Sequence, residues 1–158
     1  MPKIHSQIDP RSPAFKENRA AMLDQINELR ELERMIRARS EQSRDRFQSR
    51  NQLLPRDRLE LLLDRGTSWL ELSTTAGYKT YDDDGGDNIS GARLITGIGV
   101  VSGVRCVVIV DDSGILAGAL HTHGVDKMNR SFDLAQENKL PAIHLVQSAG
   151  ADLLDYVP

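Results

Sequence analysis

The chain has 158 residues, 39% hydrophobic and only 4% aromatic, and its 20 basic and 23 acidic side chains give a formal net charge of −3. With a mean hydropathy of −0.40 and no apolar run of about 18 residues, no membrane-spanning helix is expected. The acidic balance excludes overall attraction to nucleic acid, and the N-terminal stretch MPKIHSQIDPRSP lacks the apolar segment of a secretory signal.

A long N-terminal helix is the first predicted element. Ser12 and Pro13 suit its N-cap and first helical position. An apolar stripe follows at steps of three and four, which requires a partner in this chain or in another subunit: Met22, Leu23, Ile26, Leu29, Leu32, Met35 and Ile36. After Arg39 the polar stretch SEQSRDRFQSRNQ predicts a frayed end or a linker, and the alternating charges between Arg30 and Arg58 indicate a solvated helical surface.

A shorter helix is predicted to begin at Pro55, with Leu59, Leu62 and Leu63 on its buried face and Gly66 as its left-handed C-terminal cap. The stretch SWLELST then alternates as a strand, and YDDDGGDN reads as a loop. After residue 66 the sequence changes from charged and helical to rich in glycine and β-branched residues. We therefore expect a helical N-terminal arm over 1–66, followed by a second domain over 67–158 that is rich in glycine and β-branched residues.

Two buried strands, RLITGIGVVSG and VRCVVIVDD, are predicted to meet at Ser102-Gly103. Their glycines miss the dinucleotide-binding spacing by one residue and precede no helix, which favours backbone crowding over nucleotide binding. Cys106, the single cysteine, lies inside the second run. This position favours a buried thiol over a nucleophile. A single cysteine cannot form a disulfide within the chain, and the lack of a disulfide framework favours a reducing compartment.

The last part of the sequence predicts, in order, a strand, a small-residue loop, a helix, a second strand and a small-residue turn. The loop SGILAGALHTHG precedes a helix over about 125–139, with Met128, Phe132 and Ala135 on one face. The strand PAIHLVQS follows, then the turn SAGAD and the start of another helix. This order predicts an α/β fold with a β-α-β unit, whose loops lie at the carboxyl ends of the strands.

No conventional catalytic constellation stands out. His121 and His123 lack a third ligand at a persuasive spacing, so no metal site is predicted. His144 suits a hydrogen-bonded core histidine, and Ser148 is not in a nucleophile elbow. Two readings of the small-residue turns stay open: tight packing, or backbone N–H groups that form an oxyanion hole for a carbonyl oxygen.

The segments LLPRDRLELLLDRGTSWLELSTTAGY, ITGIGVVSGVRCVVIVDD and GALHTHGVDKMNRSFDLAQENKLPAIHLVQSAGADL together resemble a known family. They are similar to the N-terminal part of the carboxyltransferase (β) subunit of biotin-dependent acyl-CoA carboxylases, over about Leu53 to Leu153. The segment LELSTTAGY resembles the methylcrotonyl-CoA and geranyl-CoA branch more than the propionyl-CoA branch.

This resemblance implies a crotonase-like ββα superhelix, here incomplete, preceded by the helical arm. It implies carboxyl transfer from carboxybiotin, carried by a partner subunit, to an acyl-CoA. By position, Ala149 and Gly150 would be the backbone donors to the thioester enolate. Gly118, Ala119 and Ala151 would lie at the acyl-CoA. Lys127 matches a family lysine that would either meet the CoA phosphates or remain a solvated helix residue.

The turn departs from the family pattern, because Ala149 replaces a glycine whose left-handed conformation alanine tolerates poorly. The family's biotin-side donors lie in sequence beyond this stretch, so the 158 residues alone are expected to lack them and to be inactive. Implied partners are acyl-CoA, a biotin carboxylase or biotin carrier subunit and further subunits of an oligomer, with no nucleic acid or membrane. The implied location is the cytoplasm, or the mitochondrial matrix of a eukaryote. Two alternatives stay open: a crotonase-type acyl-CoA hydratase or decarboxylase, and a non-catalytic CoA-binding or assembly subunit.

Overall fold

The computed structural model describes residues 5–79 and 90–151. The predicted loop YDDDGGDN and the predicted helix start after Ala151 lie outside these residues. By its internal contacts the chain divides into two compact units, Met1–Arg34 and Met35–Pro158. The predicted division at residue 66 therefore stays a prediction based on composition.

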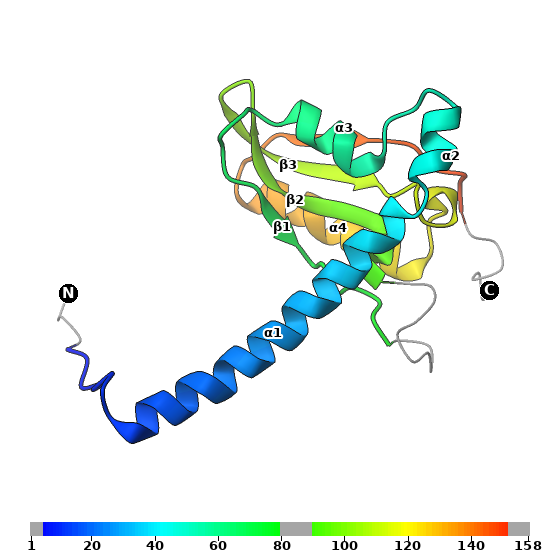
Figure 1. Cartoon of the computed structure of the whole chain (residues 1–158). Coiled ribbons are helices and arrows are strands. Elements are labelled where there is room, and N and C mark those ends of the chain that lie inside the picture. The colour runs from blue at the N-terminus through cyan, green and yellow to red at the C-terminus, as the bar shows by residue number, and fades with distance from the viewer. Residues whose placement is uncertain (1–4, 80–89, 152–158) are drawn as a thin grey trace. The chain divides into compact units, whose positions relative to one another are not determined.

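Helix α1 (Pro13–Glu41) begins where the sequence predicted (Figure 1). The Ser12 hydroxyl accepts a hydrogen bond from the Phe15 N–H at 3.2 Å, which satisfies one of the first free donors of the helix. The buried residues of α1 are Ile36 and Ser40, both in the second unit. In the first unit, Met22 and Leu29 of the predicted stripe are exposed.

Two short helices follow in the second unit, α2 (Arg44–Ser49) and α3 (Pro55–Leu62). The prediction of a frayed end or linker was wrong for α2, because Phe47 is buried and fixes this polar stretch as a helix. Helix α3 begins at Pro55 as predicted but ends before Gly66. Leu63 is already extended, so Gly66, with φ +77°, belongs to a later turn and does not cap the helix.

The four described strands form one sheet in the order β1 (Leu70–Leu72), β2 (Leu94–Val101), β3 (Val104–Asp111) and β4 (Ala142–Leu145). The β1–β2 and β2–β3 pairs are antiparallel, whereas β3 and β4 are parallel with Val108 opposite Ile143. Helix α4 (Thr122–Glu137) connects β3 to β4. The predicted β-α-β unit is therefore confirmed.

The core forms two layers, one on each face of the sheet. Val108 and Val110 of β3 pack with Leu59 of α3 on one face, and the alternate residues Val107 and Ile109 pack toward α4 on the other. Figure 1 shows α3 and α4 on opposite sides of the strands. Cys106 belongs to the first cluster and is buried, as predicted. This alternation is the period-two pattern of a strand that is covered on both faces.

The β2–β3 hairpin turns at Ser102 and Gly103, both at positive φ (51° and 78°), as a two-residue turn with the twist of the strands requires. The Asp64 carboxylate accepts the N–H groups of both residues, at 2.8 and 2.7 Å. Earlier in β2, a Cβ on Gly97 would collide with the ring of Trp69. Crowding is therefore the observed reason for this glycine.

Helix α4 is capped by His121, whose Nδ1 accepts the Gly124 N–H at 3.3 Å. Its buried positions are Gly124, Lys127, Ser131 and Ala135. Of the three residues predicted to share one face, Ala135 is buried and Met128 packs against the same cluster, whereas Phe132 is 41% exposed and lies at the edge of that face. Three of these four positions carry small residues, and Ala135 packs directly on Val107 and Ile109 of β3.

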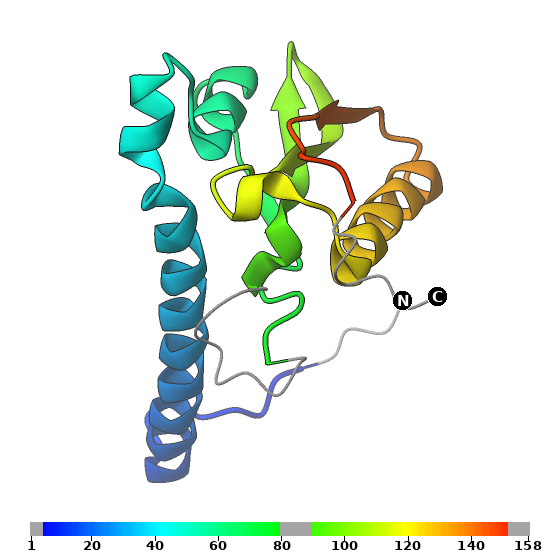
Figure 2. The same ribbon diagram turned by 90° about the vertical axis from the view of Figure 1, so that its right-hand side faces the viewer.

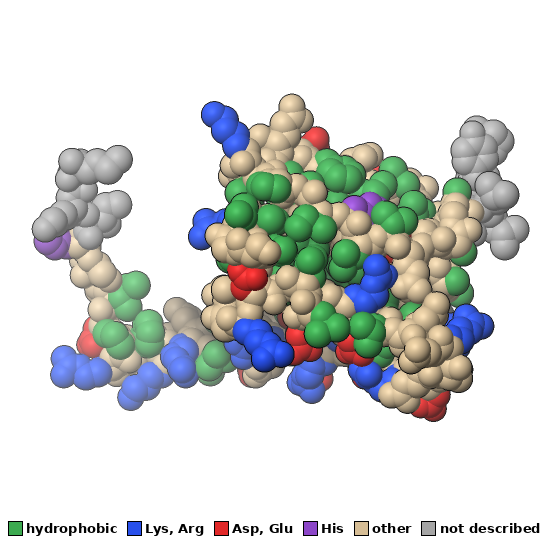
Figure 3. All heavy atoms as spheres, turned by 90° about the horizontal axis from the view of Figure 1, so that it is seen from above, with side chains coloured by type: hydrophobic (Ala, Val, Ile, Leu, Met, Phe, Trp, Pro, Cys, Tyr) green, Lys and Arg blue, Asp and Glu red, His purple; other side chains and the backbone are tan. Residues whose placement is uncertain are grey.

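The second unit also exposes apolar side chains. Figure 3 shows a broad hydrophobic area in the middle of the face that carries α3. Leu53 and Leu61, beside and within α3, are 49% and 71% exposed. Among the described residues, no helix is long and apolar enough to cross a membrane.

Candidate functional site

Because β3 and β4 are parallel, the loops that follow them meet at one edge of the sheet. Figure 2 shows the segment after β4 beside the loop that precedes α4. The Ser148 hydroxyl donates to the Gly118 carbonyl oxygen at 2.7 Å, and the Leu120 N–H donates to the Gly150 carbonyl oxygen at 2.9 Å. Leu120 also pairs with Ala151 in an isolated parallel bridge. The structure thus brings together the residues predicted from both loops.

The two loops carry unusual backbone conformations. Leu116, Ala117 and Gly118 are all at positive φ (44°, 55° and 68°), a region that non-glycine residues rarely occupy. At Gly118 a Cβ would also lie 2.8 Å from the Gln147 carbonyl oxygen, so the loops approach too closely for a side chain there. Such local strain is typical of functional loops.

Ala149 is not strained in this structure. The positive φ in the turn belongs to Gly150, at 103°, and Ala149 is not among the described residues with positive φ. The expected penalty for alanine at this position is therefore absent, because the left-handed conformation falls one residue later.

The two predicted oxyanion donors both have acceptors within the chain. The Ala149 N–H donates to the Ala117 carbonyl oxygen at 3.1 Å. The Gly150 N–H donates to the Ser148 hydroxyl of its own turn at 3.0 Å. A substrate oxygen would have to replace these acceptors, and a side-chain hydroxyl in the same turn is the easier of the two to displace, because it can rotate away.

A cavity of about 270 Å³ lies beside this turn, lined by Arg46, Phe47, Arg50, Gln52, Ser113, Ala117, Gln147, Ser148 and Ala149. Arg46 and Arg50 are exposed and are spaced one helical turn apart. The Ser113 hydroxyl is buried and has no hydrogen-bond partner among the residues that the structure describes. The cavity therefore combines positive charge, an unpaired hydroxyl and a backbone turn. This combination suits an anionic ligand that carries polar groups.

Arg46 of α2 and Arg50, the residue after α2, were missed by the sequence reasoning, which assigned them to a solvated surface. Their i,i+4 spacing was a visible signal, but α2 itself was not predicted. Arg46 is held by the loop after β3, since its Nη2 lies 3.3 Å from the Ser113 carbonyl oxygen and 3.4 Å from that of Gly114. The tertiary fold thus carries a basic side chain to the small-residue turn.

Lys127 does not fit the expected contact with CoA phosphates. It is only 5% exposed, and its Nζ donates to the carbonyl oxygens of Gly91 and Leu94 at 3.0 and 2.7 Å. Burial lowers the pKa of Lys127 to about 8, because removal from water disfavours the charged amine. The alternative of a solvated helix residue is also wrong, and Lys127 instead joins α4 to the start of β2.

Asp111 ends β3 and Asp112 follows it, and these two buried carboxylates have different partners. Asp111 accepts from His144 Nε2 at 2.9 Å and from the Gln147 N–H at 2.8 Å, so His144 is hydrogen-bonded as predicted. Asp112 accepts from the Ser40 hydroxyl at 2.6 Å, and burial raises the pKa of its carboxyl group. No cluster of three or more metal-ligating side chains occurs in residues 5–79 and 90–151.

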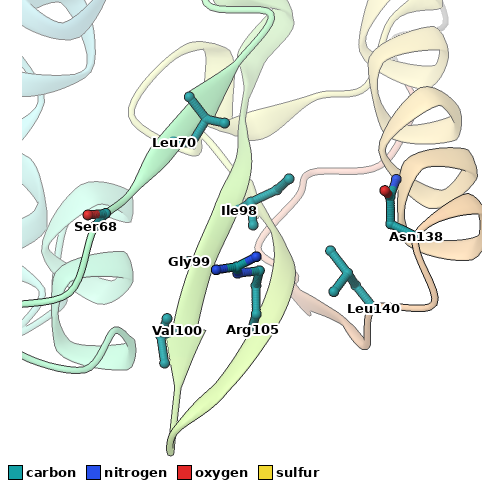
Figure 4. A pocket seen from close by; sticks show the side chains of 8 residues that line it. All are labelled: Ser68, Leu70, Ile98, Gly99, Val100, Arg105, Asn138 and Leu140. Atoms are coloured by element: carbon teal, nitrogen blue, oxygen red, sulfur yellow. The ribbon is translucent and has the colours of Figure 1, made fainter. Parts of the chain in front are cut away.

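A larger hollow of about 510 Å³ lies away from the turn, lined by Ser68, Leu70, Ile98, Gly99, Val100, Arg105, Asn138 and Leu140. In Figure 4, Leu70, Ile98 and Val100 stand on the strands, opposite Asn138 and Leu140 on the segment at the end of α4. It is a mainly apolar groove without a small-residue turn or a strained loop. We therefore take the smaller cavity as the candidate site.

The sequence of the chain is similar to those of known proteins. Residues 46–157 match the family described as "Carboxyl transferase domain". The probable methylcrotonoyl-CoA carboxylase beta chain, mitochondrial, of Drosophila melanogaster is 36% identical over 151 residues, which are 95% of this chain and 26% of that relative. The chain therefore spans about a quarter of the length of this curated relative.

Solved structures of other proteins have a similar fold. The beta subunit of P. aeruginosa geranyl-CoA carboxylase superposes with a TM-score of 0.87 at 42% identity, covering 97% of this chain and 28% of that one. The transcarboxylase 12S structure superposes with a TM-score of 0.73 at 20% identity, covering 85% and 26%, and shows the fold alone. The predicted α/β, crotonase-like fold is confirmed by these neighbours.

Proposed function

The chain belongs to the carboxyl transferase domain family, and from this premise we propose that it forms the acyl-CoA half of a carboxyltransferase site. The observation that carries the proposal is the meeting of the 116–120 loop and the 148–151 turn beside a cavity with two arginines. The reaction transfers a carboxyl group from carboxybiotin to an acyl carbon whose C–H is acidified by the thioester of an acyl-CoA. Carboxybiotin is a second substrate here, delivered by a partner subunit.

The turn would stabilise the thioester enolate. Loss of a proton from this acidified carbon places negative charge on the thioester oxygen, and that oxygen accepts the N–H groups of Gly150 and Ala149 in place of their present acceptors. A backbone donor of this kind contributes about 3 kcal/mol to the transition state. The enolate carbon then forms the new C–C bond to the carboxyl carbon as the N–C bond of carboxybiotin breaks. The electron pair of that bond stays on the ureido group of biotin, which takes up the proton lost by the acyl-CoA.

The cavity would hold the remainder of the acyl-CoA. Arg46 and Arg50 supply charge-assisted donors for its phosphates, the role first assigned to Lys127. Gly118, Ala119 and Ala151 lie where the two loops meet and would flank the thioester. The buried Ser113 hydroxyl supplies a hydrogen bond to a polar group of the ligand.

The cellular setting follows from the same family membership. We infer a biotin carboxylase or biotin carrier subunit as partner, and assembly into an oligomer. The transcarboxylase 12S protein, which shares the fold, assembles as a hexamer. We propose a location in the cytoplasm, or in the mitochondrial matrix of a eukaryote. The Drosophila melanogaster relative, which is named as mitochondrial, supports the second of these.

Isothermal titration of the chain with an acyl-CoA tests the binding half of the proposal. We expect saturable binding, weakened about tenfold by Arg50→Gln, because one charge-assisted contact with a phosphate is lost. The same titration with an acyl-pantetheine that lacks the phosphates should not distinguish Arg50→Gln from the unaltered chain. Arg65→Gln, an exposed arginine away from the cavity, is the matched control. Absence of acyl-CoA binding would refute the proposal.

The oxyanion role has its own test. An acyl-CoA labelled with ¹³C at the thioester carbonyl should show a lower C=O stretching frequency when bound, because the turn polarises the bond. An ester in place of the peptide bond at Gly150, made with an α-hydroxy acid, removes that N–H alone and should abolish the shift. In the assembled carboxylase it should lower carboxyl transfer about 100-fold. The same replacement at Ala76, whose N–H donates within a turn after β1, should change neither quantity.

A further inference from the structure

The turn that carries the proposed donors is fixed to the sheet by one buried carboxylate. Asp111, the last residue of β3, is 1% exposed. Its Oδ2 accepts the Gln147 N–H at 2.8 Å, and this is the residue that leads into the 148–151 turn. Its Oδ1 lies 2.9 Å from Nε2 of His144 on β4. One side chain of β3 therefore holds both the end of β4 and the start of the turn.

Gln147 is held from a second direction. Its side-chain oxygen accepts from Nη1 of Arg58 on α3 at 2.8 Å. The backbone of Gln147 also approaches Gly118 closely, because a Cβ on Gly118 would lie 2.8 Å from the Gln147 carbonyl oxygen. A small displacement of Gln147 would therefore shift both loops of the candidate site.

From these contacts, we propose that Asp111 is a positioning residue that sets the 148–151 turn for oxyanion binding, by anchoring Gln147 while His144 occupies its other oxygen. The inference rests on the proposed function. Asp111 lines neither cavity, so its effect passes through the backbone of Gln147. A carboxylate suits this place because both of its oxygens accept hydrogen bonds, whereas an amide can accept at only one of them.

The thioester C=O shift provides the readout, with binding affinity measured in parallel. Asp111→Ala should abolish the shift and lower carboxyl transfer by the assembled carboxylase about 100-fold, as expected for a misplaced reacting group. Its acyl-CoA affinity should change much less, because the phosphates bind at Arg46 and Arg50. Asp112→Asn is the matched control, since this neighbouring buried carboxylate binds Ser40 and not the turn. It should leave the shift unchanged.

Asp111→Asn tests whether Asp111 acts by accepting the Gln147 N–H or only by filling a buried polar position. Its amide oxygen can still accept the Gln147 N–H, while its NH₂ group faces His144 and requires Nε2 to be the unprotonated ring nitrogen. We expect this variant to retain the C=O shift, and ¹⁵N NMR to show the His144 ring proton moved to Nδ1. Loss of the shift in a chain whose His144 ring proton has moved to Nδ1, so that the amide oxygen still accepts the Gln147 N–H, would contradict the anchoring role.

A variant that leaves Asp111 in place covers the case in which Asp111→Ala does not fold. An ester at Gln147 removes only the N–H that Asp111 accepts, and should also abolish the shift. Retention of the full shift by both the Asp111→Ala chain and the Gln147 ester would overturn this inference while leaving the proposed function intact. If the unaltered chain binds acyl-CoA without any shift, the oxyanion role itself fails, and the inference fails with it.

Discussion

At the scale of single residues, Lys127 shows how burial changes the chemistry of a side chain. Its position in the sequence matches a lysine of the family, and an exposed amine could have met phosphates. In the structure its amine is enclosed and donates to two backbone carbonyl oxygens. The buried charge is destabilising unless the amine loses its proton.

The pH dependence of stability tests this assignment. The folded-state pKa of Lys127 is about 8, below the ordinary value of 10.5. Between these values the unfolded chain binds more protons, so the free energy of unfolding should rise with pH. Relative to Lys127→Met, we expect a rise of at most about 3 kcal/mol from pH 8 to pH 10.5 and no change below pH 7. Urea unfolding of both chains at several pH values measures the difference. If the difference in unfolding free energy between the two chains stays constant or falls above pH 8, burial does not lower the pKa of Lys127.

At the scale of elements, the turn of the β2–β3 hairpin is stabilised by a contact from outside the hairpin. Ser-Gly supplies the positive φ angles, but the half-buried Asp64 accepts both N–H groups of the turn. Asp64 follows α3, so the same contact fixes that helix relative to the hairpin. Two hydrogen bonds to one carboxylate stabilise a turn more than neutral partners would.

Asp64→Ala should lower the free energy of unfolding by about 2 kcal/mol, because two N–H groups lose a charged acceptor. Asp64→Asn retains one acceptor oxygen and should lose about half as much. Chemical denaturation measures both values. Amide hydrogen exchange at Gly103 should accelerate in Asp64→Ala, and unchanged exchange there would contradict the role of this contact.

At the scale of the whole molecule, the second unit contains the sheet and both core clusters. The buried residues of α1 also belong to it, since Ile36 and Ser40 follow Arg34. Ser40 donates to the buried Asp112 carboxylate, and Gly114 packs too closely against Ser40 to carry a side chain. The stability of the second unit should therefore depend on the end of α1 and not on its beginning.

Two shortened chains test this division. A chain that begins at Met35 should retain one cooperative unfolding transition, with a Tm lowered by no more than a few degrees, because it keeps Ile36 and Ser40. A chain that begins at Arg44 loses both residues and leaves Asp112 without its Ser40 donor. It should unfold at a clearly lower temperature in circular dichroism. Equal Tm values for the two shortened chains would refute the assigned role of α1.

The elements with a periodic pattern were predictable from the sequence. The capped start of α1, the Ser102-Gly103 hairpin and the β-α-β unit each follow from a local signal of spacing or turn chemistry. The family resemblance was readable as well, because its motifs lie in order along the chain. The convergence of Gly118 with Gly150 then followed from topology, since parallel strands place their carboxyl ends at one edge.

What the sequence did not contain was the partner of each polar side chain. Helix α2 was missed because one buried residue, Phe47, fixes it rather than a repeating pattern. Lys127 contacts Leu94, and Asp111 contacts Gln147, across 33 and 36 residues of sequence. The residues themselves determined the helices, the strands and the glycines that the turns require. Only tertiary packing decided which charges are buried and which backbone N–H groups already have an acceptor, because both depend on neighbours that are distant in the chain.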